Sequence, residues 1–305
     1  MPNDGGSRFA AQPSGVFVLK ILLTGASGFT GQHFTRHAQA AGHEVVPLLA
    51  DLTDKAAVAA EVAQAAPQAL VHLAAISFVG HADDAAFYAV NVVGTVHLLQ
   101  AVAALPQRLQ CALVASSANV YGNCTVSPIA EAQSPAPMNH YAASKLAMEH
   151  MAQTFADRLP MVMARPFNYT GPGQAKHFLI PKLVDHFARR APVVELGNLA
   201  VEREYNDVDF VCHSYLHLLA HGQPGQPYNV CTGYTYSLMN VVERLQRLTG
   251  HTMATQVNPS LVRANEVHRL CGNPARLREV WQCAHAAWPD APDLDHALTR
   301  MLAAA

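Results

Sequence analysis

The chain has 305 residues, of which half are hydrophobic and 14% are charged, and its formal net charge is −2. This length accommodates one large domain or two modest ones, and the near-neutral charge excludes the basic surface of a nucleic-acid-binding protein. No apolar run approaches the roughly 18 residues of a membrane span, and the N-terminal residues lack a signal-peptide pattern. The six cysteines form no C-x-x-C pair, so we expect a cytoplasmic protein with reduced thiols and no membrane partner.

Short apolar runs alternate with helix-like stretches along the chain. Residues 1–15 are rich in Gly, Pro, Ser and Asn, which predicts a mobile tail. The alternation predicts an α/β fold, a doubly wound Rossmann-type parallel sheet with a smaller C-terminal substrate-binding region. We expect the sheet domain to comprise residues 16–165 and about 206–232, and the second region to comprise 166–205 and 233–305. The apolar runs expected to form strands in the first part are 16–23, 43–49, 69–75, 110–115 and 161–164, and the first of them is expected to be buried on both faces.

A glycine-rich turn follows the first expected strand and precedes a helix. Gly25, Gly28 and Gly31 stand in a G-x-x-G-x-x-G pattern that also contains Ser27, Phe29 and Thr30. Glycines at such a turn let the backbone approach a pyrophosphate, whose charge then lies at the N-terminus of the helix. The turn therefore predicts a dinucleotide-binding site.

The end of the second expected strand carries neither an acid nor an arginine that would choose between NAD and NADP. Asp51 and Leu52 follow the strand at once, as though a connecting segment were shortened. Asp51 is placed either to bond the adenine edge or to cap a helix. The coenzyme is therefore expected to be NADPH or NADH, with the choice left open.

Three side chains form a candidate catalytic set. Tyr141 and Lys145 are four residues apart in a segment of strong helix formers, so they share one helix face. An ammonium beside a phenol favours the phenolate and brings its pKa toward a working acid/base range. Ser117 follows an apolar strand and is expected at the carboxyl edge of the sheet, where open α/β folds bind ligands.

Together these motifs resemble the extended short-chain dehydrogenase/reductases, a family of sugar-nucleotide epimerases, dehydratases and ketoreductases. The resemblance covers about residues 18–280 and implies that Tyr141 is the acid/base, Lys145 its pKa partner and ribose ligand, and Ser117 the donor to the reacting oxygen. It also implies coenzyme contacts for Leu73, Ala74 and Ala75, and either an active-site role or a helix-packing role for Asn91. The matching motifs are TGASGFTG (24–31), HLAA (72–75), SSANVYG (116–122), YAASK (141–145) and RPFNYTGPGQ (165–174).

Later motifs resemble the family's nucleotide-sugar contacts. Asn168 matches an asparagine that contacts the diphosphate, and Arg203 matches an arginine that pairs with it. Arg263 with Glu266 matches a pair near the nucleotide ribose and phosphate. Arginine suits this work because its planar fork binds phosphate oxygens bidentately. The implied partners are a nucleotide-sugar substrate and a second copy of the chain in a homodimer.

The reaction is narrowed by what surrounds the triad. Dehydratases of the family carry Asp-Glu where this chain has Ala118-Asn119, so dehydration is not expected. The motifs ARPFNYTGPGQ (164–174), EREYNDVDF (202–210) and YNVCTG (228–233) resemble those of the bacterial GDP-4-keto-6-deoxy-D-mannose reductases, which form GDP-D-rhamnose. The alternative reaction is 4-epimerisation of a nucleotide sugar. Glu204 in place of aspartate and a divergent ending at 281–289 depart from that pattern.

Two other classes of protein share features with this sequence: metal-dependent enzymes and non-catalytic NADP-sensing proteins. His213, His217 and His221 recur every four residues on an expected helix. Without a neighbouring carboxylate or cysteine this stripe favours a packing or subunit-contact face over a metal site. A non-catalytic NADP-sensing protein is disfavoured because the tyrosine and lysine pair is intact.

Overall fold

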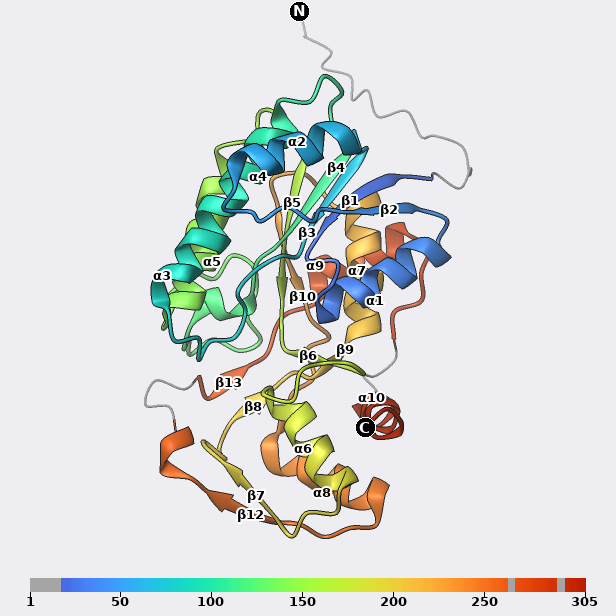
Figure 1. Cartoon of the computed structure of the whole chain (residues 1–305). Helices are drawn as coiled ribbons and strands as arrows, with labels where there is room; N and C mark the ends of the chain where they lie inside the picture. Colours follow the sequence, from blue (N-terminus) through green and yellow to red (C-terminus); the bar gives the residue numbers. More distant parts are fainter. Residues whose placement is uncertain (1–17, 263–266, 290–293) are drawn as a thin grey trace, which may run out of the picture.

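The computed structural model describes residues 18–262, 267–289 and 294–305. Figure 1 shows a sheet covered by helices on both faces, with a smaller lobe below the carboxyl ends of its strands. The tail predicted at 1–15 lies outside the described residues.

The main sheet has six parallel strands in the order β10-β5-β4-β3-β1-β2. This confirms the predicted doubly wound α/β fold. A single helix joins β2 to β3. The strands are β1 (Lys20–Thr24), β2 (Glu44–Pro47), β3 (Ala69–His72), β4 (Cys111–Ala115), β5 (Met161–Pro166) and β10 (Pro227–Val230).

Successive side chains of each strand point to opposite sides of the sheet. Because helices cover both sides, the central strands β1, β3 and β4 are buried on both faces. Ile21 and Leu23 of β1 belong to the core on one face, whereas Leu22 belongs to the core on the other. Figure 1 shows helices on both sides of the sheet. Those that contribute to the first core are α1 (Phe29–Ala40), α7 (Val208–His221) and α9 (Ala275–Cys283); those that contribute to the second are α2 (Lys55–Ala65), α4 (Thr95–Ala103) and α5 (His140–Gln153).

Helix α9 differs from the sequence-based domain division, which placed all of 233–305 in the second region. Leu277, Val280 and Trp281 of α9 are buried in the core formed with β1 and α7. The spacing of the apolar residues of α9 indicates an amphipathic helix. Only the tertiary contacts show that this helix packs on the main sheet.

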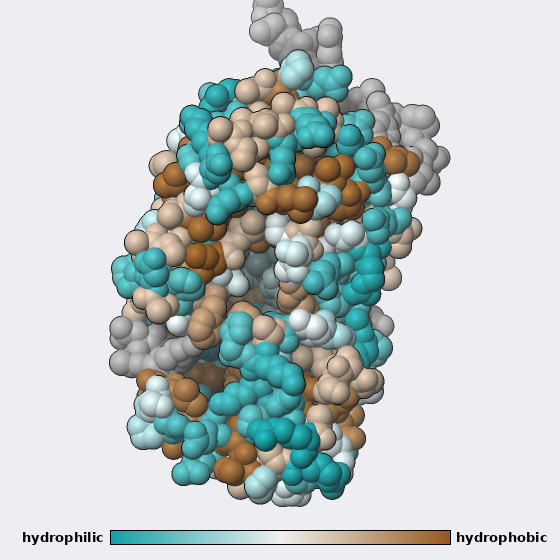
Figure 2. All heavy atoms as spheres, in the orientation of Figure 1, coloured by the Kyte–Doolittle hydropathy of each residue, from teal (hydrophilic) through white to brown (hydrophobic). Residues whose placement is uncertain are grey.

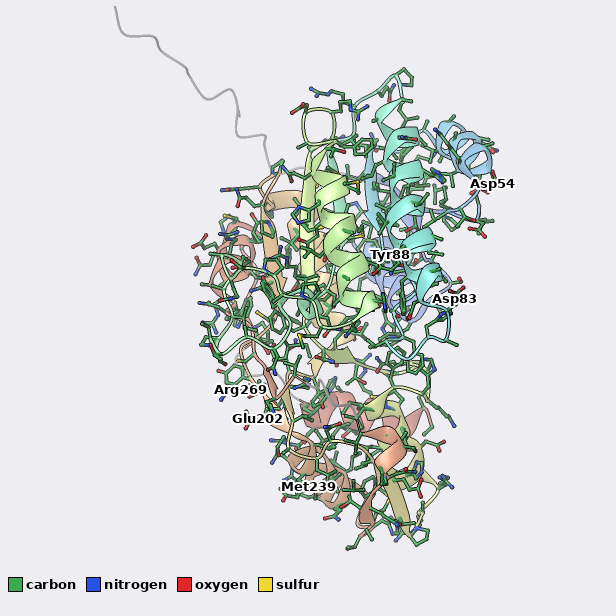
Figure 3. The ribbon with its side chains drawn as sticks, turned by 90° about the vertical axis from the view of Figure 1, so that its left-hand side faces the viewer. Asp54, Asp83, Tyr88, Glu202, Met239 and Arg269 are labelled. Atoms are coloured by element: carbon green, nitrogen blue, oxygen red, sulfur yellow. The ribbon has the colours of Figure 1, made fainter. Side chains whose placement is uncertain are left out.

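Helix starts are fixed by side-chain caps. The carboxylate of Asp54 accepts hydrogen bonds from Ala56 N and Ala57 N at the start of α2. Asp83 does the same at the start of α3 (Asp84–Tyr88), and both caps lie on the face seen in Figure 3. Such caps satisfy backbone N–H groups that the first helical turn leaves unpaired.

One helical run among the described residues is long and apolar enough to cross a membrane by length and composition alone. It comprises α3, the π-helical turn η1 (Ala89–Gly94) and α4, with a mean hydropathy of 1.4 over its window. Phe87, Leu98 and Leu99 of this run are nevertheless buried inside the protein. A core helix of a globular fold passes the same test.

The smaller lobe has a core of its own, formed mainly by residues 180–205, 238–253 and 294–301. Its helices pack beside short two- and three-stranded sheets, which tie distant segments of the chain together. The helices are α6 (Leu179–Ala188), α8 (Leu238–Thr249) and α10 (Leu294–Ala303), with a 3₁₀ turn η3 (Pro259–Leu261); a second 3₁₀ turn, η2 (Ala118–Tyr121), follows β4 of the main sheet. The short strands are β6 (Tyr169–Thr170), β7 (Val193–Leu196), β8 (Glu202–Arg203), β9 (Asn206–Asp207), β11 (Tyr236–Ser237), β12 (Ala254–Val257) and β13 (Arg269–Leu270).

Glu204 joins the lobe to the sheet domain through a fully buried carboxylate. It accepts hydrogen bonds from the backbone N–H of Thr232 at 2.8 Å and of Gly272 at 2.7 Å, and from Asn206 Nδ2 at 3.0 Å. Burial raises the pKa of this carboxyl, and the hydrogen bonds from Gly272 and Thr232 oppose that rise. The residue that departs from the family pattern therefore holds three chain segments together.

We expect Glu204→Gln to lower the free energy of unfolding by about 2–4 kcal/mol, because an amide NH₂ would face buried N–H donors. The exposed Glu243→Gln on α8 is the matched control and should change stability by about 0.5 kcal/mol or less. Denaturant unfolding measures both. Equal free energies of unfolding for the two variants would contradict the role of Glu204 in holding these segments together.

Candidate active site

A cavity of about 320 Å³ lies where the strands of the main sheet end. Figure 2 shows this face of the molecule hollowed between the sheet domain and the smaller lobe. The lining includes the glycine turn, the loops after β3 and β4, the start of α5 and the segment after β5. The cavity thus occupies the carboxyl edge, where open α/β sheets bind ligands.

The glycine turn is shaped by close backbone approaches. Gly25 has φ +71°, and a Cβ there would lie 2.8 Å from Ala74 N. A Cβ on Gly31 would lie 2.1 Å from Gly25 O, so helix α1 could not approach the turn. Gly28 has φ −74°, which any residue adopts, and a Cβ there would lie 3.2 Å from Gly25 O, a tight contact but far less severe than the one at Gly31. The three glycines line an open cradle at the start of α1, which fits a pyrophosphate.

A buried hydrogen-bond chain joins the carboxyl ends of the neighbouring strands β1 and β3 beside this turn. Thr24 Oγ1 accepts from Leu73 N at 3.1 Å and Ala74 N at 3.0 Å, so its proton faces His72 Nδ1 at 2.7 Å. His72 Nε2 then donates to Thr95 Oγ1 at 2.8 Å. Burial, with a smaller effect of Lys145, lowers the pKa of His72 to about 3. This histidine is therefore neutral, and it fixes the loop that carries Leu73 and Ala74 along the cavity.

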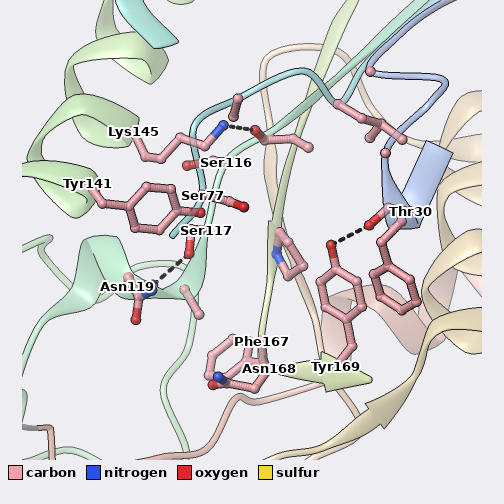
Figure 4. A pocket seen from close by; sticks show the side chains of 18 of the residues that line it. Thr30, Ser77, Ser116, Ser117, Asn119, Tyr141, Lys145, Phe167, Asn168 and Tyr169 are labelled. Atoms are coloured by element: carbon pink, nitrogen blue, oxygen red, sulfur yellow. Dashed lines mark hydrogen bonds between the residues drawn. The ribbon is translucent and has the colours of Figure 1, made fainter. Parts of the chain in front are cut away.

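The structure brings the predicted catalytic residues together. Tyr141, Lys145 and Ser117 are buried and line the cavity, as Figure 4 shows. Lys145 Nζ donates to Ala115 O at 2.7 Å, at the end of β4. Ser117 Oγ accepts from Asn119 N at 3.2 Å, which turns the chain into the short helix η2. The i, i+4 spacing places the tyrosine and lysine on one face, as the sequence predicts.

The electrostatics differ from the expectation that Lys145 favours the phenolate. Burial raises the pKa of Tyr141, and a hydrogen bond with Ser117 opposes the rise. Burial also lowers the pKa of Lys145 to about 8, against the attraction of Glu149. The same loss of water penalises the phenolate and the ammonium, so it moves the two pKa values toward each other. Tyr141 in this state is a protonated acid.

Two residues of the site were missed by the sequence analysis. Ser116 Oγ is buried without a hydrogen-bond partner, and Ser116 lines the cavity. An unpaired buried hydroxyl is costly, which fits a group that bonds to a ligand. Tyr169 OH lies 2.8 Å from Thr30 Oγ1 and so connects the glycine turn to the segment after β5 (Figure 4). Ser116 adjoins the predicted Ser117, but only the structure distinguishes their partners.

Several other predicted coenzyme residues lie outside the cavity lining. Asp51 accepts from Thr53 N and Thr53 Oγ1, both at 2.8 Å, in a local turn before α2. Leu52 is buried beneath Gly94. Asn91 accepts from Ile76 N and donates to Ser144 Oγ, so it ties the loop after β3 to the catalytic helix α5. The helix-packing alternative for Asn91 thus matches its contacts.

The predicted substrate residues have different surroundings. Asn168 lines the cavity beside Phe167 (Figure 4). Arg203 is buried in β8, where its guanidinium donates to the carbonyls of Glu202, His268 and Val267. It is not among the residues that line the cavity. Arg263 and Glu266 lie outside the described residues.

The histidine stripe packs against neighbouring helices. The ring of His213 lies 4.5 Å from that of His37 on α1, and the ring of His217 lies 4.7 Å from Trp281 on α9. Burial lowers the pKa of all three stripe histidines, that of His217 to about 4. No group of three or more metal-ligating side chains occurs within the described parts of the chain.

The sequence of residues 21–231 matches the NAD dependent epimerase/dehydratase family. GDP-6-deoxy-D-talose 4-dehydrogenase of Aggregatibacter actinomycetemcomitans is 32% identical, over 86% of this chain and 91% of its own length. GDP-6-deoxy-D-mannose reductase of Pseudomonas aeruginosa is 34% identical, over 86% of this chain and 90% of its own length.

Solved structures share the fold over nearly the whole chain. RMD from Pseudomonas aeruginosa complexed with NADPH is 31% identical, with a TM-score of 0.85, and the match covers 94% of this chain and 97% of that one. A structure from Burkholderia cenocepacia J2315, described as a candidate epimerase, is 42% identical with a TM-score of 0.84. That match covers 93% of this chain and 97% of the other.

We expect Gly28→Val to lower dinucleotide affinity by about 100-fold or more, because its side chain would occupy the space of a pyrophosphate. A Cβ at Gly28 presses only on Gly25 O at 3.2 Å, so the unfolding temperature should fall much less than for a residue with a hard collision. Gly31→Val, which collides with Gly25 O, should instead unfold at a clearly lower temperature. Titration of NADH fluorescence and a melting curve separate the two effects, and unchanged binding by Gly28→Val would remove the site from the glycine turn.

We expect Lys145→Met to raise the free energy of unfolding at pH 7 by about 1–3 kcal/mol while abolishing activity, because it removes a buried charge. The pKa of Lys145 falls from 10.5 to about 8 on folding. Below pH 8 the full cost of burying the ammonium is present; between pH 8 and 10.5 the folded protein has already lost the proton, so the wild type gains stability. The difference in free energy of unfolding between Lys145→Met and wild type, measured by denaturant unfolding, should therefore be smaller at pH 10 than at pH 7. A difference independent of pH would contradict the buried ammonium.

Proposed function

Because the chain belongs to the NAD dependent epimerase/dehydratase family, we propose that it reduces the C4 ketone of a nucleotide-activated 4-keto-6-deoxy sugar. The substrate is GDP-4-keto-6-deoxy-D-mannose and the product GDP-D-rhamnose. The observation that carries the proposal is the buried set of Tyr141, Ser117 and Lys145 in one cavity with the glycine turn. The names of the two relatives described above, both for GDP-6-deoxyhexose enzymes, support the sugar and the base.

The cavity holds the groups that ketone reduction requires. Gly25, Gly28 and Gly31 would hold NAD(P)H, which would supply the hydride for sugar C4. Tyr141 donates its phenolic proton to the oxygen of the former ketone, and Ser117 hydrogen-bonds the same oxygen as negative charge develops there. Burial keeps the phenol protonated at neutral pH, which is the state an acid needs.

Dehydration is disfavoured by the residues that follow Ser117. Elimination of water across the ring requires a proton donor and an acceptor beside the triad. Ala118 and Asn119 line the cavity at those positions, and neither has a carboxyl group. The chain therefore has the residues for hydride transfer without those for elimination.

A 4-epimerase is the second candidate, favoured by the description of the Burkholderia cenocepacia structure. An epimerase first oxidises the sugar hydroxyl, which requires Tyr141 to act as a base. The raised pKa of Tyr141 opposes that step, whereas it suits the reductive direction. For either reaction we expect the substrate diphosphate against Asn168, with Arg263 and Glu266 near the nucleotide ribose and phosphate.

We also propose a homodimer in the cytoplasm. Tyr88, Val93 and Met151 form part of the α3, η1 and α5 surface and are 36%, 47% and 40% exposed. Figure 3 shows α4 and α5 side by side on this face. Large exposed side chains of this kind favour a protein contact. The six cysteines are free, as a reducing compartment requires.

The purified protein should oxidise one NAD(P)H for each GDP-4-keto-6-deoxyhexose and leave UDP-glucose and UDP-galactose unchanged. Tyr141→Phe should lower turnover by about 10²–10⁴-fold with little change in coenzyme affinity. Absorbance of the reduced coenzyme and chromatography of the sugars measure both. Interconversion of UDP-hexoses without added coenzyme would replace the reductase by the epimerase.

A further inference from the structure

The end of β2 offers no polar side chain of its own. In Rossmann folds this position binds the adenosine ribose, through an acid when the coenzyme is NAD and through an arginine when a 2′-phosphate is present. Here Leu48 is buried and the side chain of Leu49 is 81% exposed. Leu48 N donates to Leu23 O, two residues before Gly25, so this strand end lies beside the glycine turn.

A carboxylate reaches the same place from another element. Glu61 stands in the middle of α2, and its Oε2 accepts from Leu49 N at 2.8 Å. The helix that carries it is fixed by the Asp54 cap and by Val58 and Val62, which are buried in the core. A rigid helix therefore holds an acid at the strand end, 12 residues beyond the position where the sequence rule seeks one.

The surrounding charge disfavours a phosphate. Between Gly28 and Ala66 the cations are Arg36 and Lys55. Arg36 NH2 lies 2.6 Å from His33 Nδ1, on the side of α1 where His33 contacts Asp209 of α7. Lys55 is six residues from Glu61, which places it about 120° away around the axis of α2.

We propose that Glu61 binds the adenosine ribose diol and selects NADH over NADPH. The inference rests on the proposed coenzyme-dependent function and identifies which coenzyme serves it. A carboxylate accepts hydrogen bonds from ribose hydroxyls, and it repels a 2′-phosphate that carries close to two negative charges. Glu61 thus takes the role that the missing acid at the end of β2 would have. The solved RMD structure contains NADPH, so the assignment rests on Glu61 of this chain and is not carried over from that relative.

The test is direct binding of NADH and NADPH to coenzyme-free protein, measured by nucleotide fluorescence and by calorimetry. Wild type should bind NADH at least about tenfold more tightly than NADPH, the effect of one hydrogen bond to a charged group together with charge repulsion. Glu61→Gln should weaken NADH by about tenfold and narrow or reverse the preference. The double variant Leu49→Arg with Glu61→Gln should prefer NADPH, because a guanidinium then faces the phosphate.

Glu44→Gln is the matched control, since Glu44 lies at the opposite end of β2 and pairs with Lys20. It should leave the ratio of the two affinities unchanged, and melting curves of both glutamine variants check that α2 stays folded. A wild type that binds NADPH as tightly as NADH, or a Glu61→Gln variant with an unchanged ratio, overturns the assignment. Reduction of the sugar with NADPH would then leave the proposed function standing. Selective NADH binding without any sugar reduction would instead support Glu61 and overturn the function.

Discussion

The cavity depends on the loops that follow the paired strands β1 and β3, and a buried hydrogen-bond chain at the carboxyl ends of these strands holds the loops in place. Thr24 holds the backbone N–H groups of Leu73 and Ala74, and His72 passes the connection on to Thr95. Thr95 Oγ1 donates to Asn91 O, and Asn91 in turn holds Ile76 and Ser144. The side chains of Thr24, His72, Asn91 and Thr95 are buried and hydrogen-bonded, so removing one leaves another unsatisfied at a cost of about 1–3 kcal/mol. The glycine turn and the catalytic helix are thereby held in one frame.

The exclusion of water from the cavity sets the pKa values of the catalytic residues. A buried phenol and a buried ammonium both lose the solvation of their charged forms, so the pKa of Tyr141 rises while that of Lys145 falls. The protonated phenol suits the reduction of a ketone, and the buried lysine destabilises the fold for the sake of the site. The buried hydroxyl of Ser116, which has no hydrogen-bond partner, also costs stability. Such local costs are typical of groups that await a ligand.

The smaller lobe is attached through polar contacts as well as through its core. Glu204 binds three segments with a single carboxylate, and Tyr169 joins the segment after β5 to Thr30 at the glycine turn. The substrate side of the cavity is therefore fixed relative to the coenzyme side. Arg203 illustrates the consequence, because its guanidinium is engaged by backbone carbonyls of the lobe and lies outside the cavity lining. An arginine that a motif assigns to the diphosphate thus contributes to the framework around it.

The sequence by itself determined the features that depend on local spacing: the buried strands, the glycine turn and the shared helix face of Tyr141 and Lys145. Short apolar runs, the spacing of glycines and the i, i+4 rule operate within a few residues, so they can be seen without a fold. Only the tertiary structure decided which distant groups meet. The partners of His72, the segments held by Glu204, the layer covered by α9 and the arrival of Glu61 at Leu49 all join residues far apart in the chain. Hydrogen bonds of this kind depend on the packing of whole elements, and no pattern in the neighbouring residues records them.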